Sequence, residues 1–140
     1  MPQVIVDTSP LVAMLNKQDQ YHSWVIEQLK QIQLPLLTCE AVLVETCFLL
    51  HKQSPAQVQS IFNALQNDLL HISFQISDEV PALQEMIAKY TSVPMSLADA
   101  CLVRMSEHYP QAKVFTLDSD FHIYRKNRNE IISCIIPPER

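Results

Sequence analysis

Two aspartates follow apolar runs at places where their carboxylates could do chemistry. Asp7 comes directly after residues 4–6, and Asp118 comes directly after residues 114–117. Because the carboxyl ends of strands in open α/β sheets line the ligand crevice, both acids are well placed to bind a ligand. Each also has a simpler explanation, since an aspartate there can cap a helix or stabilise a turn through hydrogen bonds to the backbone.

Two further acids lie in segments predicted to be helical. Glu45 lies in the apolar run 41–50, where burial of a lone carboxylate is costly without a metal or an opposite charge. Alternatively, Glu45 occupies the only solvated stripe of that helix, and the sequence favours neither explanation. Asp99 follows Ser96 at the spacing of a capping box, although the apolar run 100–103 also predicts that its helical turn packs near the core.

Carboxylates that gather in one place repel one another and raise one another's pKa. A hard divalent cation with oxygen ligands, Mg²⁺ or Mn²⁺, resolves this repulsion. No Cys or His accompanies the acids at ligand spacing, which disfavours zinc. Such a site would perform phosphoryl chemistry by activating water and neutralising charge on the reacting oxygens. Asp120, two residues after Asp118, is a further candidate ligand or a helix cap.

Short apolar runs alternate with longer amphipathic segments, which predicts an α/β fold. We expect strands at residues 4–6, 36–38, 69–76, 114–117 and 131–136. We expect helices beginning at residues 8 and 54, and helices over 21–32, 40–52, 77–90 and 97–108. The chain has no internal repeat, low-complexity segment or linker, so we expect residues 1–140 to form one domain.

The charge of the chain bears on nucleic-acid binding. A net charge of −5 gives no global attraction for nucleic acid, so RNA binding would need a local basic patch. The densest basic cluster is Arg125, Lys126 and Arg128, which could hold phosphates but could equally be an ordinary solvated turn. Tyr124 beside it could stack on a base.

Composition excludes several classes of protein. Glycine is absent, which excludes the Walker and dinucleotide-binding loops. The spacing of the four cysteines matches neither a zinc motif nor a disulfide scaffold, so we interpret them as reduced core residues: Cys39, Cys47, Cys101 and Cys134. Neither a secretory signal at the start nor a membrane span is recognisable, and we expect a cytoplasmic protein. A haloacid-dehalogenase-like phosphatase needs a second aspartate two residues after the first, and Ser9 stands there instead, so this class of enzyme fits poorly.

The sequence resembles the PIN-domain family, including VapC-like toxins of bacterial toxin–antitoxin pairs. The resemblance covers essentially the whole chain. Single motifs are weak, but their order and spacing are specific. They are Val4-Ile5-Val6-Asp7-Thr8-Ser9, Glu45 in the third helix, Ser96-Leu97-Ala98-Asp99-Ala100, and Thr116-Leu117-Asp118-Ser119-Asp120-Phe121.

The resemblance implies a parallel five-stranded sheet flanked by helices in three α/β/α layers. It also implies hydrolysis of RNA by metal-activated water, with Mg²⁺ or Mn²⁺ held by Asp7, Glu45, Asp99 and Asp118 and with help from Asp120. Small hydroxyl residues near the metals would be Thr8, Ser9 and Thr116. Because many members of the family are homodimers and its toxins are neutralised by an antitoxin protein, the resemblance also implies a homodimer and an antitoxin partner. The sequence departs from the family in having no glycine in its loops. His22 lies in a segment that resembles a recurring helix start in the family, where we expect a structural role. The competing hypothesis is an inactive PIN-like module that binds RNA or protein without cleaving.

Overall fold

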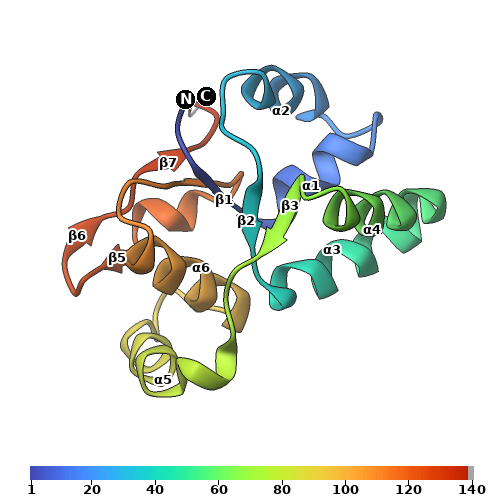
Figure 1. The fold of residues 1–140 in the computed structure, drawn as a ribbon. Helices are drawn as coiled ribbons and strands as arrows, with labels where there is room; N and C mark the ends of the chain where they lie inside the picture. The colour runs from blue at the N-terminus through green and yellow to red at the C-terminus, as the bar shows by residue number, and fades with distance from the viewer. Residues whose placement is uncertain (139–140) are drawn as a thin grey trace.

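The computed structural model describes residues 1–138, which contain a sheet of five parallel strands in the order β3-β2-β1-β4-β7 (Figure 1). The strands are β1 (Val4–Val6), β2 (Leu36–Thr38), β3 (Leu70–Ile72), β4 (Lys113–Phe115) and β7 (Cys134–Ile135). β1 is central, and its Ile5 pairs with Leu37 of β2 and Val114 of β4. The predicted five-stranded parallel sheet is confirmed.

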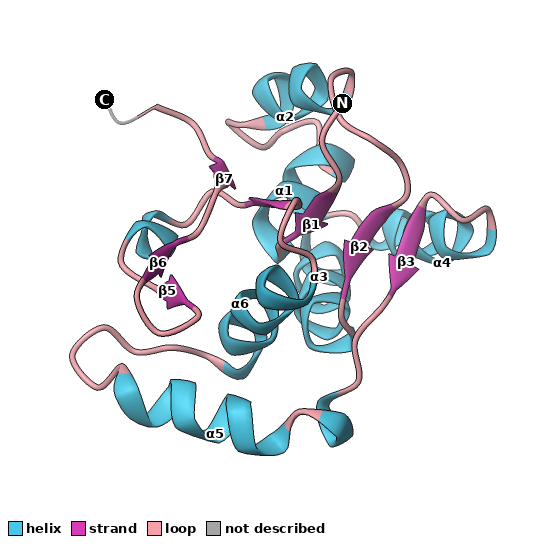
Figure 2. Cartoon of the chain, turned by 60° about the vertical axis from the view of Figure 1, so that its left-hand side comes forward, coloured by secondary structure: helices cyan, strands magenta, loops and turns pink. Residues whose placement is uncertain are grey.

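Helices cover both faces of this sheet. They are α1 (Thr8–Leu15), α2 (His22–Leu29), α3 (Glu40–Gln53), α4 (Val58–Gln66), α5 (Val80–Lys89) and α6 (Leu97–His108). Connections between parallel strands are right-handed, so the path from β1 through β2 to β3 places α1 to α4 on one face. The chain then crosses to β4 on the other side of β1, which places α5 and α6 on the opposite face (Figure 2).

The core forms where the helices meet the central strands. Ile5, Val114 and Phe115 have no exposed surface, which is expected for strands covered on both sides. Residues 100–103 of α6 are also fully buried, as their apolar run predicted, and α6 contacts β1 and β4. The first turn of α6, which carries Asp99, therefore starts from a rigid part of the molecule.

Several predicted elements have other bounds in the structure. The helix predicted over 21–32 ends at Leu29, and the helix predicted to begin at residue 54 starts as a 3₁₀ turn (Pro55–Gln57). β3 ends at Ile72 rather than 76, because its partner β2 ends at Thr38 and leaves the later residues nothing to pair with. The helix predicted over 77–90 begins at Val80, after a 3₁₀ turn (Ile76–Asp78), since Pro81 is tolerated only in the first helical turn.

The last predicted strand, 131–136, is divided between two sheets. β6 (Glu130–Ile131) pairs antiparallel with β5 (Arg125–Lys126) in a hairpin that the sequence did not predict, and β7 joins the main sheet. Residues 127–129 form the turn, in which Asn127 and Arg128 have φ angles of 47° and 76°. Asn tolerates this left-handed region, whereas Arg gives no sequence signal for it.

All four cysteines are free. Cys39 and Cys101 lie in the core as predicted, whereas Cys47 and Cys134 are only half-buried. Among residues 1–138, no helix combines the length and apolar character needed to cross a membrane.

Candidate functional site

A pocket of about 450 Å³ opens at the carboxyl ends of β1 and β4. At this point the strand order reverses, because β2 and β3 lie on one side of β1, and β4 and β7 lie on the other. This is the place where open α/β sheets bind ligands. Four predicted acids line it, and we refer to Asp7, Glu45, Asp99 and Asp118 as the four pocket acids. Segments far apart in sequence are thus brought to one place. The other lining residues are Thr8, Ser9, Leu49, Ser96 and Leu117.

Asp7 is the most deeply buried of the pocket acids, with 7% of its surface exposed. Its Oδ1 accepts a hydrogen bond from the Thr8 backbone N–H at 2.7 Å, and its Oδ2 accepts one from Thr116 Oγ1 at 2.7 Å. Burial raises the pKa of Asp7 from 3.8 to about 6 despite these bonds, and the charges of Asp99 and Asp118 contribute in the same direction. Asp7 also caps α1, so both sequence-based explanations describe the same side chain.

The predicted hydroxyl residues connect the elements that carry the acids. Thr116 Oγ1 accepts a hydrogen bond from the Asp118 backbone N–H at 3.0 Å, in addition to donating to Asp7. Ser9 Oγ accepts from the Leu117 backbone N–H at 3.3 Å. These bonds fix the start of α1 against the end of β4, although Thr116 itself does not line the pocket.

Glu45 lies on the exposed stripe of α3, which settles the alternative that the sequence left open. Its neighbours Val44 and Phe48 are 72% and 60% exposed, so this helix is not buried on all sides. Glu45 still faces the pocket, and its Oε2 accepts a long hydrogen bond of 3.4 Å from Thr8 Oγ1.

Asp99 forms the predicted capping box with Ser96. Its backbone N–H donates to Ser96 Oγ at 3.0 Å, and its Oδ2 accepts from the Ser96 backbone N–H at 3.1 Å. The hydroxyl of Tyr124 lies 3.4 Å from the same Oδ2. Burial is the main cause of the raised pKa of Asp99, and the charge of Asp118 adds to it. Capping does not exclude a role in the pocket, which Asp99 lines.

Asp118 and Asp120 have different positions. Asp118 lines the pocket, and its Oδ1 accepts from the Asp120 backbone N–H at 2.9 Å, which caps a 3₁₀ turn (Ser119–His122). Asp120 is half-buried and does not line the pocket. A direct role of Asp120 in metal binding therefore stays a prediction from the resemblance.

The donor set of the pocket suits a hard divalent cation. It consists of carboxylate and hydroxyl oxygens, which Mg²⁺ and Mn²⁺ prefer and zinc in structural sites does not. Within residues 1–138, no donor reaches Glu45 Oε1, Asp99 Oδ1 or Asp118 Oδ2, so each of these acids keeps one oxygen free.

The acids are not yet arranged around one point. In the described part of the chain, no group of three or more His, Cys, Asp or Glu side chains is placed to hold a metal ion. Asp7, Asp99 and Asp118 instead use one oxygen to cap a helix or turn. The oxygens that accept no hydrogen bond are of the kind that Mg²⁺ and Mn²⁺ prefer, so the residues present fit such a cation by their chemistry.

The predicted RNA-binding cluster is only partly available. Lys126 is buried, with its Nζ 3.5 Å from the Ser106 carbonyl oxygen, so its prediction as an RNA contact is wrong. Arg125 donates from its guanidinium group to three backbone carbonyls at the end of the preceding 3₁₀ turn. Arg128 is exposed, and the Lys89 ammonium group donates to its carbonyl oxygen at 2.6 Å.

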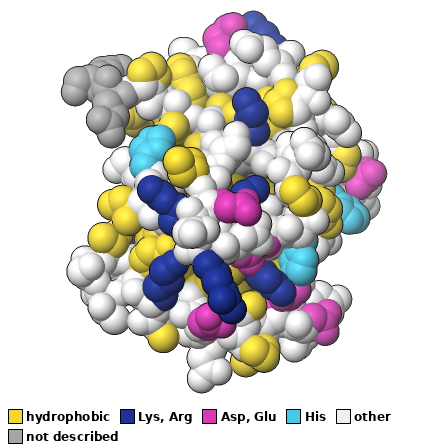
Figure 3. Space-filling model, turned by 90° about the vertical axis from the view of Figure 1, so that its left-hand side faces the viewer, with side chains coloured by type: hydrophobic (Ala, Val, Ile, Leu, Met, Phe, Trp, Pro, Cys, Tyr) yellow, Lys and Arg dark blue, Asp and Glu magenta, His cyan; other side chains and the backbone are white. Residues whose placement is uncertain are grey.

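Arg128 belongs to a groove of about 250 Å³ between α5 and the β5–β6 hairpin, which we call the basic groove. Its charged lining residues are Lys89, Arg104, Arg125, Arg128, Glu85 and Glu107. The cationic side chains outnumber the acidic ones by two, and Lys and Arg side chains gather on this face of the molecule (Figure 3). Tyr124 is fully buried beneath it, so the prediction that it stacks on a base is wrong.

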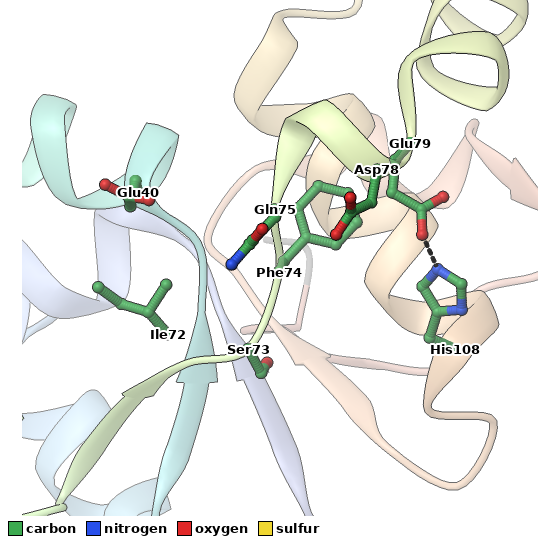
Figure 4. A pocket seen from close by; sticks show the side chains of 8 residues that line it. All are labelled: Glu40, Ile72, Ser73, Phe74, Gln75, Asp78, Glu79 and His108. Atoms are coloured by element: carbon green, nitrogen blue, oxygen red, sulfur yellow. Dashed lines mark hydrogen bonds and ion pairs between the residues drawn. The ribbon is translucent and has the colours of Figure 1, made fainter.

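Another pocket, of about 340 Å³, contains acids but none of the four pocket acids (Figure 4). Its Glu79 pairs with His108 and, at 2.7 Å, with Arg104. The hydrogen bond from Arg104 is the main cause of the lowered pKa of Glu79. The negative charge of Glu79 is therefore compensated by these two partners, whereas the buried carboxylate of Asp7 has no cationic partner among residues 1–138.

Comparison with models of protein families matches the PIN domain over residues 4–127. The chain belongs to the PIN-domain family. Its fold is similar to that of the crystal structure of Mycobacterium tuberculosis VapC20, described as a sarcin-ricin loop cleaving toxin. The TM-score is 0.73 at 19% sequence identity, over 84% of this chain and 92% of that one. A comparison with curated proteins found no match. The family and the three-layer α/β fold predicted from the sequence are confirmed.

The pKa of Asp7 makes a prediction about stability. Because its pKa is about 6 in the folded protein and 3.8 ordinarily, the folded state binds the proton more tightly than the unfolded state. The contribution of Asp7 to stability therefore falls as pH rises between these values, and ionised Asp7 destabilises the metal-free fold at neutral pH. Asp7→Asn is expected to stabilise it by about 1–3 kcal/mol at pH 7, measured by urea unfolding in EDTA.

The stabilisation by Asp7→Asn should disappear below about pH 4, where the wild-type Asp7 carboxyl group becomes protonated in both the folded and the unfolded state. Asp78→Asn is the matched control, since Asp78 is exposed and should change stability by less than about 0.5 kcal/mol. A wild-type protein more stable than Asp7→Asn at pH 7 would contradict the destabilising role of the Asp7 charge.

Proposed function

We propose that this PIN domain is a ribonuclease that uses Mg²⁺ or Mn²⁺ held by the four pocket acids. The observation that carries the proposal is the shared pocket at the ends of β1 and β4. Acids with raised pKa values at the point where sheets of this kind bind ligands indicate an uncompensated negative site.

The residues of the pocket would have distinct tasks. Asp7, fixed through both oxygens by Thr8 and Thr116, is the rigid ligand at the base of the pocket. Glu45 is exposed and reaches the pocket from α3, which suits a ligand at its mouth. When bound, the cation would supply an activated water and neutralise charge on the scissile phosphate.

RNA is the substrate class that the comparisons favour. VapC20 is described as cleaving the sarcin-ricin loop, and the basic groove offers this chain a surface for the phosphate backbone. The groove matters because the net charge of −5 would otherwise repel RNA. In this proposal Arg128 and Lys89 contact phosphates, while Arg125 supports the hairpin that presents them.

The proposal extends to partners. Similarity to the VapC20 toxin supports an antitoxin protein as the inhibitor of this chain. The exposed Val44 and Phe48 on α3 support a homodimer, because large exposed apolar side chains mark interaction surfaces.

Replacement of Glu45 tests the catalytic role without disturbing the core. A pool of labelled structured RNAs is incubated with Mg²⁺ or Mn²⁺ and either wild type, Glu45→Gln or Glu40→Gln. Both glutamates are exposed on α3, but only Glu45 lines the pocket at Asp7. Glu45→Gln is expected to slow cleavage at least about 100-fold, because the pocket loses one of its charges, whereas Glu40→Gln should cleave like wild type.

EDTA is expected to abolish cleavage by the wild type. Cleavage that survives EDTA, or that Glu45→Gln retains in full, would contradict the proposed metal-dependent mechanism. Binding of RNA and Mn²⁺ without any cleavage would instead identify a PIN domain that binds without cutting.

The basic groove makes a separate prediction about RNA affinity. Arg128→Gln removes one exposed cationic group from the groove, and Lys30→Gln removes one from the end of α2, where Lys30 pairs with Glu27. Measured in EDTA, Arg128→Gln is expected to weaken RNA binding several-fold and to reduce the salt dependence of the affinity by about one phosphate contact. Equal effects of the two variants would show that RNA does not use the groove.

A further inference from the structure

Tyr124 lies behind the pocket and contacts one of its acids. Its side chain has no exposed surface, and its hydroxyl donates to the Pro94 carbonyl oxygen at 2.9 Å with Asp99 Oδ2 at 3.4 Å. We propose that Tyr124 is a positioning residue that holds Asp99 in place for the divalent cation. This inference rests on the proposed function.

The two contacts of the hydroxyl differ in strength and act together. The 2.9 Å bond to Pro94 has ordinary hydrogen-bond length, whereas 3.4 Å to Asp99 is a weak, shared contact. The strong bond anchors the segment that leads into α6, and the weak one restrains the carboxylate at its first turn. Both oxygen contacts of Asp99, from Tyr124 and from the Ser96 backbone N–H, involve Oδ2. Within residues 1–138 its Oδ1 accepts no hydrogen bond and remains free for a cation.

Aromatic packing holds the Tyr124 ring itself. The ring meets Tyr90, the residue after α5, edge-on at 5.1 Å and Phe121 edge-on at 5.3 Å between centroids. Pairs of this geometry favour one relative orientation beyond their burial. A fixed ring gives the hydroxyl a fixed position, so the contact with Asp99 does not depend on a mobile side chain.

The contact between Tyr124 and Asp99 links two segments of the pocket that lie far apart in sequence. Phe121 and Tyr124 belong to the segment that directly follows Asp118, whereas Asp99 lies on α6. The hydroxyl therefore joins the segment that carries one pocket acid to the turn that carries another. Supporting residues of this kind fix the orientation of the side chains that bind metals.

Tyr90 provides a matched comparison within the same aromatic cluster. Its hydroxyl accepts a hydrogen bond from the Arg125 backbone N–H at 2.9 Å and lies in the basic groove, not the acidic pocket. Tyr90→Phe and Tyr124→Phe each remove one hydroxyl and keep the ring. A merely structural role of the two hydroxyls would affect urea unfolding but would not separate the variants in metal binding.

The test is Mn²⁺ titration of the metal-free protein, followed by electron paramagnetic resonance of free Mn²⁺, for wild type, both Tyr variants and Asp99→Asn. The Kd of Tyr124→Phe for Mn²⁺ is expected to rise about tenfold, while that of Tyr90→Phe stays within a factor of two of wild type. In the Asp99→Asn background, Tyr124→Phe should have no further effect, because the carboxylate that it positions is gone.

Failure of the inference and failure of the proposed function would look different. Wild-type binding of Mn²⁺ that Tyr124→Phe retains in full, or that Tyr90→Phe loses equally, would overturn the positioning role alone. No binding of Mn²⁺ by the wild type would overturn the metal site and, with it, the role of Tyr124.

Discussion

The carboxylate of Asp7 lies at the end of the central strand, between the first turn of α1 and the end of β4, almost out of contact with water. Two hydrogen bonds at 2.7 Å hold it, yet its pKa remains raised to about 6, because they do not offset the loss of hydration. The surrounding acids increase this cost. A folded chain that keeps such a charge has stability to gain from any cation that binds there.

The topology of the sheet creates this situation. β1 and β4 are neighbours although the whole α/β region between them separates them in sequence, and Thr116 reaches Asp7 across that gap. α1 and α6 begin beside the pocket, with Asp7 as the cap of one and Asp99 in the capping box of the other. The partial positive charge of helix starts stabilises acids there. The capping bonds that complete the helices thus also hold the acids near one another.

Sequence patterns could predict the features of the site that depend on residues close together in the chain. Asp7 and Asp118 could be placed because each follows a short apolar strand, and the strand ends of parallel sheets share one edge. Glu45 was a candidate because a lone carboxylate in an apolar run needs a partner if it is buried. The sequence left burial and exposure open, and exposure is what the structure has, since Val44 and Phe48 are also exposed. An apolar run cannot distinguish a buried helix from one that presents an interaction surface.

Contacts between distant segments could not be predicted in this way. Tyr124 was expected at the surface because it precedes a basic cluster, but Tyr90 and Phe121 enclose its ring. Lys126 is buried in β5, which belongs to a hairpin that the sequence did not predict. The hairpin could not be recognised because its turn, which includes Asn127 and Arg128, contains no glycine. The burial of Tyr124 and Lys126 depends on how α5, α6 and the hairpin pack against one another, and a local sequence pattern does not predict that packing.

If the four pocket acids hold one centre of divalent metal, a crystal of the protein soaked in Mn²⁺ should contain the ion in their pocket. Diffraction recorded at the manganese absorption edge should show an anomalous peak bound by Asp7 and by at least one of Glu45, Asp99 and Asp118. Metal–oxygen distances should be about 2.0–2.2 Å. A peak only in the pocket at Glu79, or no peak under saturating Mn²⁺, would show that the four pocket acids do not form a metal site.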